Sequence, residues 1–188
     1  MALEIELKLK VDAFEPTIAK LKQLDAEFEG DFLQTDAYYD DSTDSLVNSD
    51  RCLRIRKHKN HLGQAIELTY KGARENHRFK SRREIGLKVE KAEELAEVFS
   101  HLGYRERLSI EKKRSLWDFA GCKVALDELP LIGKFIEIEG PDDKIIEEAQ
   151  RKLGLEKIPH IPQSYAHLME EAMKKTGSKQ RKIVFDKK

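Results

Sequence analysis

The chain begins with Leu3-Glu4-Ile5-Glu6-Leu7-Lys8-Leu9-Lys10, in which apolar and charged residues alternate without a break. Side chains of a β-strand point alternately to its two faces, so this stretch predicts a strand with one apolar and one charged face. Taken alone, the pattern is typical of an amphipathic strand whose charged face lies in water. The strands predicted further along the chain change that interpretation.

Later segments repeat this alternation or show the helical spacing of apolar residues. Strands are predicted at 32–40, 52–56, 64–71, 81–89, 108–119, 122–129 and 134–139, with a bulge near Ser115. Helices are predicted at 16–28, where Gly30 ends the helix, and at 91–102, 142–153 and 164–175. Loops are expected at 41–50, 57–63, 72–80 and 155–163. One strand, one helix and three strands follow one another over 3–71 and again over 82–139, which indicates two related halves of one sheet system.

Composition limits the classes of function. The 188 residues are typical of one domain, and 35 basic residues balance 35 acidic ones, which argues against a partner bound through nucleic-acid phosphates. The apolar runs are shorter than the ~20 residues that span a membrane, and the first residues do not form a signal peptide. Cys52 and Cys122 cannot form a disulfide framework, so we expect a cytoplasmic protein.

The charged strand faces favour a closed sheet. Their opposite faces are apolar, so if the helices cover those outer faces, the charged faces point into the interior. A closed antiparallel barrel with a polar lumen satisfies both demands and leaves no exposed sheet edge. The acids on these faces are Glu4, Glu6, Glu67, Glu84, Asp127, Glu137 and Glu139, and the bases are Lys8, Arg54, Arg56, Lys71, Arg82, Lys112 and Arg114.

So many buried charges are costly unless they neutralise one another or a ligand. The basic set fits a ligand with several negative charges, because arginine holds phosphate in a bidentate geometry. The glutamates fit hard cations, since Mg²⁺ and Mn²⁺ prefer carboxylate and water oxygens. A metal-bound polyphosphate would need both sets. The alternative for each residue is a solvated surface charge.

The opening strand also resembles a known signature. Glu4-Ile5-Glu6-Leu7-Lys8 is similar to the ExExK motif of the CYTH, or triphosphate tunnel metalloenzyme, superfamily, which includes class IV adenylate cyclases, thiamine triphosphatases and inorganic triphosphatases. The resemblance extends to about Leu168, through Leu53-Arg54-Ile55-Arg56, Leu68-Thr69-Tyr70-Lys71-Gly72, Arg82-Arg83-Glu84-Ile85, Ile110-Glu111-Lys112-Lys113-Arg114, Leu126-Asp127-Glu128, Gly133-Lys134-Phe135-Ile136-Glu137-Ile138-Glu139 and Ser164-Tyr165. It implies an α+β fold, an antiparallel eight-stranded β-barrel flanked by helices, with one domain at 1–176 and a basic tail at 177–188.

The resemblance also assigns roles. The triphosphate would be held by Lys8, Arg54, Arg56, Lys71, Arg82, Lys112 and Arg114. The divalent metal, Mg²⁺ or Mn²⁺, would be held by Glu4, Glu6, Asp127, Glu137 and Glu139. The catalytic set would be Glu4, Glu6, Lys8 and Glu84. Many relatives carry a further acid two positions after Glu84, where this chain has Gly86, so any role of that acid is in doubt.

The sequence of residues 109–139 resembles the class IV cyclase branch more than the thiamine triphosphatase branch. This resemblance implies conversion of ATP to cyclic AMP and pyrophosphate. The alternatives are hydrolysis of inorganic, thiamine or nucleoside triphosphate, a non-catalytic polyphosphate- or nucleotide-binding module, and an RNA 5′-triphosphatase. The shared fold does not decide among them. The sequence does not identify the organic group on the triphosphate, and an exposed strand or helix face could form a homodimer.

Some residues have simpler interpretations. Asp127 could instead cap the hairpin near Pro130. Tyr38 and Tyr165 are more often core aromatics than ligand contacts. His58 and His61 have the spacing of a metal pair but no neighbouring ligands, so we interpret them as loop residues. The tail at 177–188 is expected to be loose and solvated.

Overall fold

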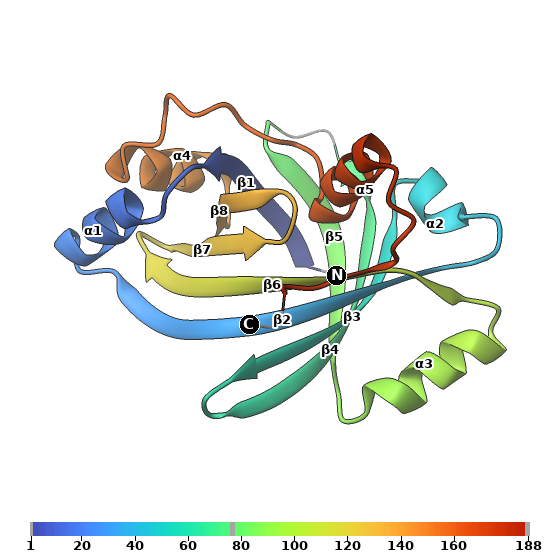
Figure 1. Ribbon diagram of the computed structural model, residues 1–188. Coiled ribbons are helices and arrows are strands. Elements are labelled where there is room, and N and C mark those ends of the chain that lie inside the picture. The colour runs from blue at the N-terminus through green and yellow to red at the C-terminus, as the bar shows by residue number, and fades with distance from the viewer. Residues whose placement is uncertain (1, 76–77, 187–188) are drawn as a thin grey trace.

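The computed structural model describes residues 2–75 and 78–186 (Figure 1). Its elements in chain order are β1 (Ala2–Val11), α1 (Glu15–Gln23), β2 (Glu27–Asp40), α2 (Ser45–Asn48), β3 (Cys52–Asn60), β4 (Gly63–Glu75), β5 (Lys80–Val89), α3 (Ala92–His101), β6 (Arg105–Phe119), β7 (Cys122–Leu129), β8 (Gly133–Gly140), α4 (Asp143–Lys152), α5 (Tyr165–Thr176) and β9 (Lys182–Ile183).

Strands β1 to β8 form a closed antiparallel barrel. They are ordered β2-β3-β4-β5-β1-β8-β7-β6, and β6 pairs back onto β2 to complete the circle. The predicted eight-stranded barrel with flanking helices is therefore confirmed. The repeated order of one strand, one helix and three strands is also found, except that the short helix α2 lies between β2 and β3 in the first repeat. In the β1–β8 register Glu6 lies opposite Glu139, and in the β1–β5 register Glu4 lies opposite Arg82.

The opening strand has the two faces that its alternation predicts. Ile5, Leu7 and Leu9 are buried outside the barrel, where they share a core with Leu21 of α1 and Ile146 of α4. Helix α3 covers another part of the outer surface, through a cluster that includes Tyr39, Ile55 and Phe99. These apolar contacts hold the wall in place, so the charged residues of the strands are left to face the lumen.

Helix α5 is placed differently from the other helices. Its Tyr165 and Met169 pack with Ile110 of β6 and Phe135 of β8. These two residues lie two positions before Lys112 and Glu137, on the same face of their strands as these charges. By strand alternation these apolar residues lie on the inner face of the wall. The assumption that the helices cover outer faces is therefore wrong for α5, which fills one end of the lumen.

Of two predictions about irregular positions, one is wrong and one is confirmed. The first helix ends at Gln23 rather than at Phe28, which belongs to β2 and packs its ring 4.8 Å from that of Trp117. Phe28 follows Leu24 at helical spacing, so the sequence could not separate the two elements. The predicted bulge near Ser115 is confirmed, because the β2–β6 register shifts between Phe28 and Gly30, whose partners Trp117 and Leu116 directly follow Ser115. A second register shift lies between Tyr38 and Tyr39.

The loops are shorter than predicted. Helix α2 lies within the predicted loop 41–50, and β3 and β4 extend to Asn60 and Gly63 through most of the predicted loop 57–63. Of the predicted loop 72–80, residues 76–77 lie outside the described residues, and β4 and β5 occupy most of the rest. His58 consequently lies on β3, and its assignment to a loop is wrong.

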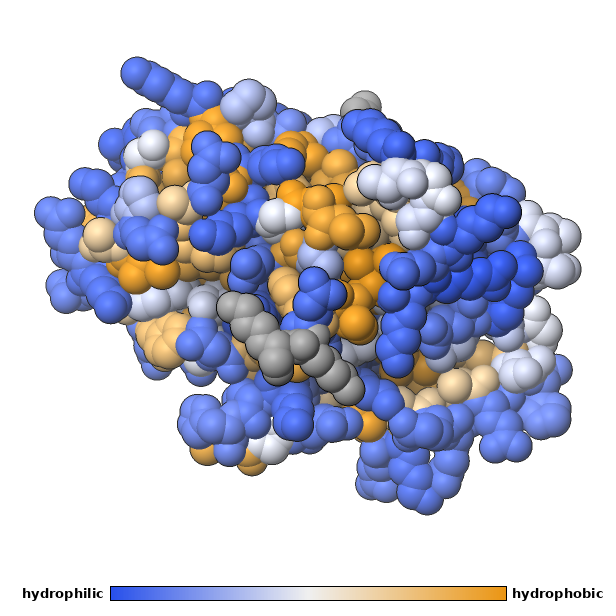
Figure 2. All heavy atoms as spheres, viewed as in Figure 1, coloured by the Kyte–Doolittle hydropathy of each residue, from blue (hydrophilic) through white to orange (hydrophobic). Residues whose placement is uncertain are grey.

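The C-terminal segment is partly ordered by the barrel. Strand β9 pairs in parallel with Ser109 and Ile110 of β6, and Ile183 is buried. The prediction of a loose tail is therefore wrong at Lys182–Ile183, while residues 187–188 lie outside the described part of the chain. The face in Figure 2 is hydrophilic around its edge, and hydrophobic residues gather toward its centre. Among the residues that the structure describes, no helix has both the length and the apolar character needed to span a bilayer.

Candidate active site

The barrel encloses a cavity of about 810 Å³. This volume lies within the ~300–1,000 Å³ typical of small-molecule sites. Its wall consists of inward-facing side chains of the strands, together with residues of α2 and α5. The lining includes every predicted site residue except Asp127, namely Glu4, Glu6, Lys8, Arg54, Arg56, Lys71, Arg82, Glu84, Lys112, Arg114, Glu137 and Glu139.

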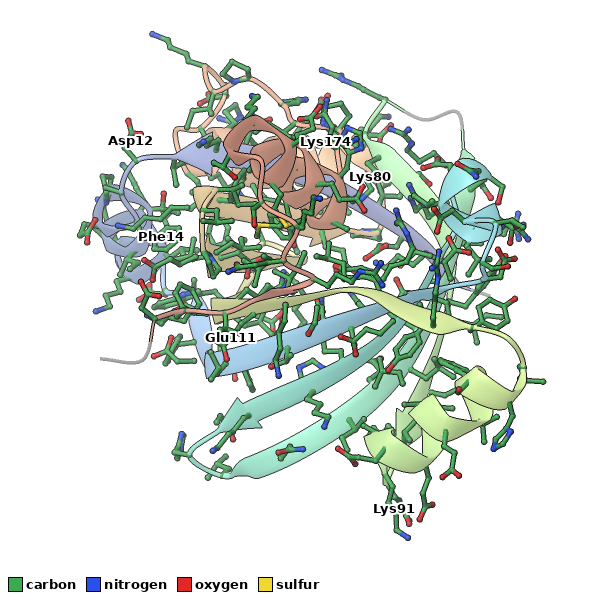
Figure 3. The ribbon with its side chains drawn as sticks, turned by 45° about the vertical axis from the view of Figure 1, so that its right-hand side comes forward. Asp12, Phe14, Lys80, Lys91, Glu111 and Lys174 are labelled. Carbon is green, nitrogen blue, oxygen red and sulfur yellow. The ribbon has the colours of Figure 1, made fainter. Side chains whose placement is uncertain are left out.

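One side of the cavity is an acidic wall, formed by Glu4 and Glu6 of β1 and Glu137 and Glu139 of β8. Lysines from β4 and β5 neutralise the two β1 acids. Lys71 Nζ lies 2.6 Å from Glu4 Oε2, and Lys80 pairs with Glu6 Oε1 (Lys80 is labelled in Figure 3). Lys80 was missed by the sequence analysis, because it was assigned to the loop before β5.

The acids of this wall differ in how well their charge is balanced. Burial, together with the charge of Glu4, raises the pKa of Glu139 to about 7. Burial also acts to raise the pKa of Glu6, but the charges of Lys80, Lys8 and Lys71 together outweigh it and lower that pKa to about 2. Within the described residues, no side chain makes a hydrogen bond or ion pair with Glu139. The wall therefore holds negative charge that is not fully compensated.

The acidic wall fits a hard divalent cation. Its donors are all carboxylates, the ligands preferred by Mg²⁺ and Mn²⁺, and the raised pKa of Glu139 marks the repulsion that a cation would relieve. The described residues contain no ready-made group of three His, Cys, Asp or Glu ligands. In this structure Lys71 and Lys80 occupy the carboxylates of Glu4 and Glu6, so these lysines hold the place of a cation.

A second side, the arginine wall, consists of Arg54, Arg56 and Arg114 with the buried acids Asp36 and Asp127. Arg56 donates to both oxygens of Asp36, at 2.5 and 2.6 Å, and Arg54 Nη1 lies 3.7 Å from the same carboxylate. Although burial opposes it, the charge of Arg56 holds the pKa of Asp36 far below its usual range. Asp36 was missed, because its strand was recognised by its aromatic residues and its register against Arg56 is not readable from sequence.

Asp127 belongs to the arginine wall and not to the cavity lining. Its side chain is fully buried and accepts two hydrogen bonds from Arg114, at 2.7 and 2.6 Å, and one from the Tyr165 hydroxyl, at 3.0 Å. Asp127 therefore positions Arg114, and its predicted role as a metal ligand does not fit this place. Arg114 also reaches Glu137 at 2.6 Å, which links the two walls.

Two lysines lie deep in the cavity beside Tyr165. Lys8 Nζ lies 3.3 Å from Glu137, donates to the Gln163 carbonyl at 2.9 Å and sits 4.1 Å from the centre of the Tyr165 ring. Burial and the nearby charge of Arg114 lower the pKa of Lys112 to about 7, because its contact with Asp127 is long, at 3.4 Å. Tyr165, which we predicted to be a core aromatic, is buried and also lines the cavity. Tyr38, which we also predicted to be a core aromatic, is partly buried and lines the cavity as well.

Arg82 is held at the opposite edge by a residue that sequence reasoning missed. It donates to the carbonyl of Asp50 at 2.6 Å and to its carboxylate at 2.7 Å. Arg74 donates to the other carboxylate oxygen at 2.8 Å. Asp50 lies in the polar segment before β3, and no sequence signal distinguishes it from the neighbouring acids.

The space beside Gly86 is occupied by a neighbouring acid. A Cβ atom at Gly86 would lie 2.9 Å from Glu67 Oε1, so the carboxylate of Glu67 lies over this position. Glu67 Oε2 is 3.5 Å from His58 Nε2, and His58 Nδ1 is 2.9 Å from Gln34 Nε2. An acid from β4, Glu67, thus faces the cavity beside Gly86.

These features define a charged tunnel, that is, a closed barrel whose lumen joins a ring of cations to a wall of carboxylates. The family model of the CYTH domain matches residues 2–165, and the chain belongs to this family. Solved CYTH tunnel proteins share its fold.

Three relatives illustrate the similarity. MJ0240 of Methanocaldococcus jannaschii, named as a candidate adenylate cyclase, is 29% identical over 175 residues, covering 88% of this chain and 98% of its own. PH1819 of Pyrococcus horikoshii has a TM-score of 0.78 and 28% identity, covering 89% of this chain and 98% of its own. HpAC1 of Hippeastrum, described as a candidate adenylyl cyclase with a dominant triphosphatase activity, has a TM-score of 0.68 and 15% identity, covering 91% and 96%.

Proposed function

We propose that this protein is a divalent-metal-dependent enzyme that acts on a triphosphate inside the tunnel and converts ATP to cyclic AMP and pyrophosphate. One observation carries the proposal: cations from five strands and four glutamates of the acidic wall line the same cavity. These cations, which we call the cationic ring, are Lys8, Arg54, Arg56, Lys71, Arg82, Lys112 and Arg114. The name of the M. jannaschii relative supports the choice of ATP.

The arginines are arranged before the substrate arrives. Asp36 fixes Arg54 and Arg56, and Asp127 fixes Arg114, each through a buried carboxylate. An arginine held in this way loses little conformational freedom when it binds phosphate. The triphosphate would therefore be bound along the arginine wall, with its phosphorus atoms held in a fixed orientation.

The acidic wall would supply the metal site. Glu4, Glu6, Glu137 and Glu139 would hold Mg²⁺ or Mn²⁺, which offsets the charge that develops on the phosphate oxygens. Lys71 lies between Glu4 and Glu84, 2.6 Å from one and 2.8 Å from the other, so it can remain paired while Glu4 changes partner. Glu84 lines the cavity as a carboxylate, because Lys71 outweighs burial and lowers its pKa. We assign Glu84 to accept the proton of the attacking hydroxyl.

Hydrolysis is the second candidate. If water attacks in place of the ribose 3′-hydroxyl, the products are a diphosphate and inorganic phosphate. The fold does not separate the two reactions, since the barrel is shared with HpAC1. The carboxylate of Glu67, held by His58 beside the cationic ring, is the feature of this chain that favours a bound water.

Product analysis tests these proposals. The protein is incubated with ATP and with tripolyphosphate, each with Mg²⁺ or Mn²⁺, and the products are resolved by chromatography. Cyclic AMP and pyrophosphate from ATP would support the cyclase, whereas orthophosphate without cyclic AMP would replace it with the triphosphatase. Tight triphosphate binding without turnover under any condition would exclude both and leave a binding module.

A further inference from the structure

The cavity has a part that the cationic ring does not account for. In the part beside α2 and α5, which we call the mouth, the lining includes Leu46, Val47 and Asn48 from α2, Leu108 from β6, and Ala166 and Glu170 from α5. Val47 is 43% exposed although it is a large apolar side chain. An apolar lining has no use for a bare phosphate chain, so this region fits an organic group attached to the triphosphate.

Arg107 is directed into this mouth by an irregularity in the barrel. Tyr38 pairs with Leu108 and Tyr39 with Glu106, so Arg107 is left out of the β2–β6 pairing. A bulge of this kind redirects a side chain that would otherwise follow the strand alternation. Arg107 lines the cavity and is 26% exposed.

Two acids from different elements hold the Arg107 side chain. Its Nε lies 3.0 Å from Asp44, just before α2, and its Nη1 lies 3.1 Å from Glu170 of α5. Asp40 in turn fixes α2, since its carboxylate accepts from the amides of Leu46 and Val47 at 3.0 and 2.9 Å. The mouth is therefore a built arrangement in which Arg107 joins α2 to α5.

The charges at the mouth argue against a fourth phosphate position. Arg107 is balanced by Asp44 and Glu170, so its charge is already compensated. What it presents is a planar guanidinium beside a carboxylate, that is, hydrogen-bond donors next to acceptors. The edge of a nucleobase carries the complementary acceptors and donors, and its ring faces would contact Leu46, Val47 and Leu108.

We propose that Arg107 is a specificity residue that recognises the planar base of a nucleoside triphosphate while the phosphates occupy the cationic ring. The inference rests on the proposed function and names the substrate class of the same site. It requires that Arg107 contribute to the binding and turnover of ATP but not to those of tripolyphosphate.

The test compares Arg107→Ala with Arg105→Ala. Arg105 also pairs with Asp44, at 3.6 Å, but its side chain is 49% exposed and lies outside the cavity lining formed by the described residues. We expect Arg107→Ala to lower kcat/KM for ATP by about tenfold or more and to change that for tripolyphosphate by less than about twofold. Arg105→Ala should leave both values within about twofold. Equal losses for both substrates in Arg107→Ala, or no loss for ATP, would overturn the inference.

Two further measurements keep the test decisive. Arg107→Lys retains the charge without the planar donors, so it replaces Arg107→Ala if the alanine variant is misfolded, and we expect the same ATP-specific loss. If the wild-type protein does not turn over either compound, the dissociation constants of ATP and tripolyphosphate measured by calorimetry give the same ratio. In that case the proposed reaction would be wrong, but the ratio of dissociation constants would still test the role of Arg107. A wild-type protein that binds neither compound would overturn both proposals.

Discussion

The acidic wall and the arginine wall use their carboxylates in opposite ways. In the arginine wall, Asp36 lies between Arg54 and Arg56, and Asp127 accepts from Arg114 and Lys112, so each buried acid is fully used in holding cations. In the acidic wall, Glu139 faces other acids, and its pKa is raised to about 7 by burial and by Glu4. The difference teaches that carboxylates with similar positions in an alternating sequence have separate roles, which their neighbours decide.

Removing an acid from the arginine wall should produce the largest effect on stability. Asp36→Ala would leave Arg54 and Arg56 buried without their shared partner. Breaking a buried pair in this way costs ~3–5 kcal/mol, a large part of the ~5–15 kcal/mol of a typical domain. Urea denaturation followed by circular dichroism should show this decrease in the free energy of unfolding.

An exposed ion pair provides the matched control. Glu93 lies 2.6 Å from Lys57, but its side chain is 77% exposed, so Glu93→Ala should leave the denaturation midpoint unchanged. A midpoint for Asp36→Ala that matches the wild type would mean that Asp36 does not hold the arginine wall.

Removing an acid from the acidic wall should affect activity much more than stability. In Glu4→Ala, Lys71 retains Glu84 as a partner at 2.8 Å, so no buried charge is left alone. If Glu4 holds the metal, turnover of the triphosphate should fall by at least ~100-fold, which corresponds to about 2.7 kcal/mol. Steady-state kinetics and denaturation of the same preparation would measure both quantities. Full metal-dependent activity in this variant would remove Glu4 from the metal site.

The barrel and the charged character of its lumen could be predicted from the sequence. The alternation of Glu4, Glu6 and Lys8 with apolar residues specifies the inner face of β1, and the same period works for every strand that carries a predicted site residue. The boundary between α1 and β2 was not predictable, because Phe28 continues the helical spacing of Leu24. Strand β9 was not predictable either, since its pairing with β6 depends on contacts far apart in the chain.

The partners of the charged residues were the main omission. Asp36, Asp50 and Lys80 each neutralise a predicted site residue, but they come from other strands or from a loop. Which charges meet depends on the strand register and on side-chain reach, which the sequence period does not encode. Asp127 shows the same omission: its interpretation as a metal ligand did not include Arg114 and Tyr165, which donate hydrogen bonds to its oxygens.

Lys112 should make the binding of the triphosphate by the two walls depend on pH. Burial lowers its pKa to about 7, and a bound triphosphate would favour the charged amine and raise this pKa. Above pH 7 the free protein must take up a proton on binding, so the dissociation constant should rise by up to ~tenfold per pH unit between pH 7.5 and 9. The charged and titratable groups that face Lys112 are Arg114, Arg56, Asp127, Asp36 and Tyr165.

Calorimetry in buffers with different ionisation enthalpies would measure this proton uptake. Lys112→Arg keeps a positive charge over the whole range, so its dissociation constant should lose this part of the pH dependence. A variant with the same pH dependence as the wild type would show that another group takes up the proton.

A substitution at Gly86 tests whether Glu67 acts like the positioning acids of the arginine wall or like the acids of the acidic wall. Glu67 lies opposite Arg56 in the β3–β4 register and contacts His58. In having basic neighbours it resembles Asp36 and Asp127, the acids that position the arginine wall. The Cβ of Gly86→Ala would meet the end of this flexible side chain at 2.9 Å and displace it, with little change in stability because alanine restricts the unfolded chain. If Glu67 only positions its neighbours, activity should fall by about two- to fivefold, and Glu67→Gln should give the same factor. A loss as large as that of Glu4→Ala, measured under the same metal concentrations, would instead place Glu67 with the acidic wall as a group that contacts the metal or the nucleophile.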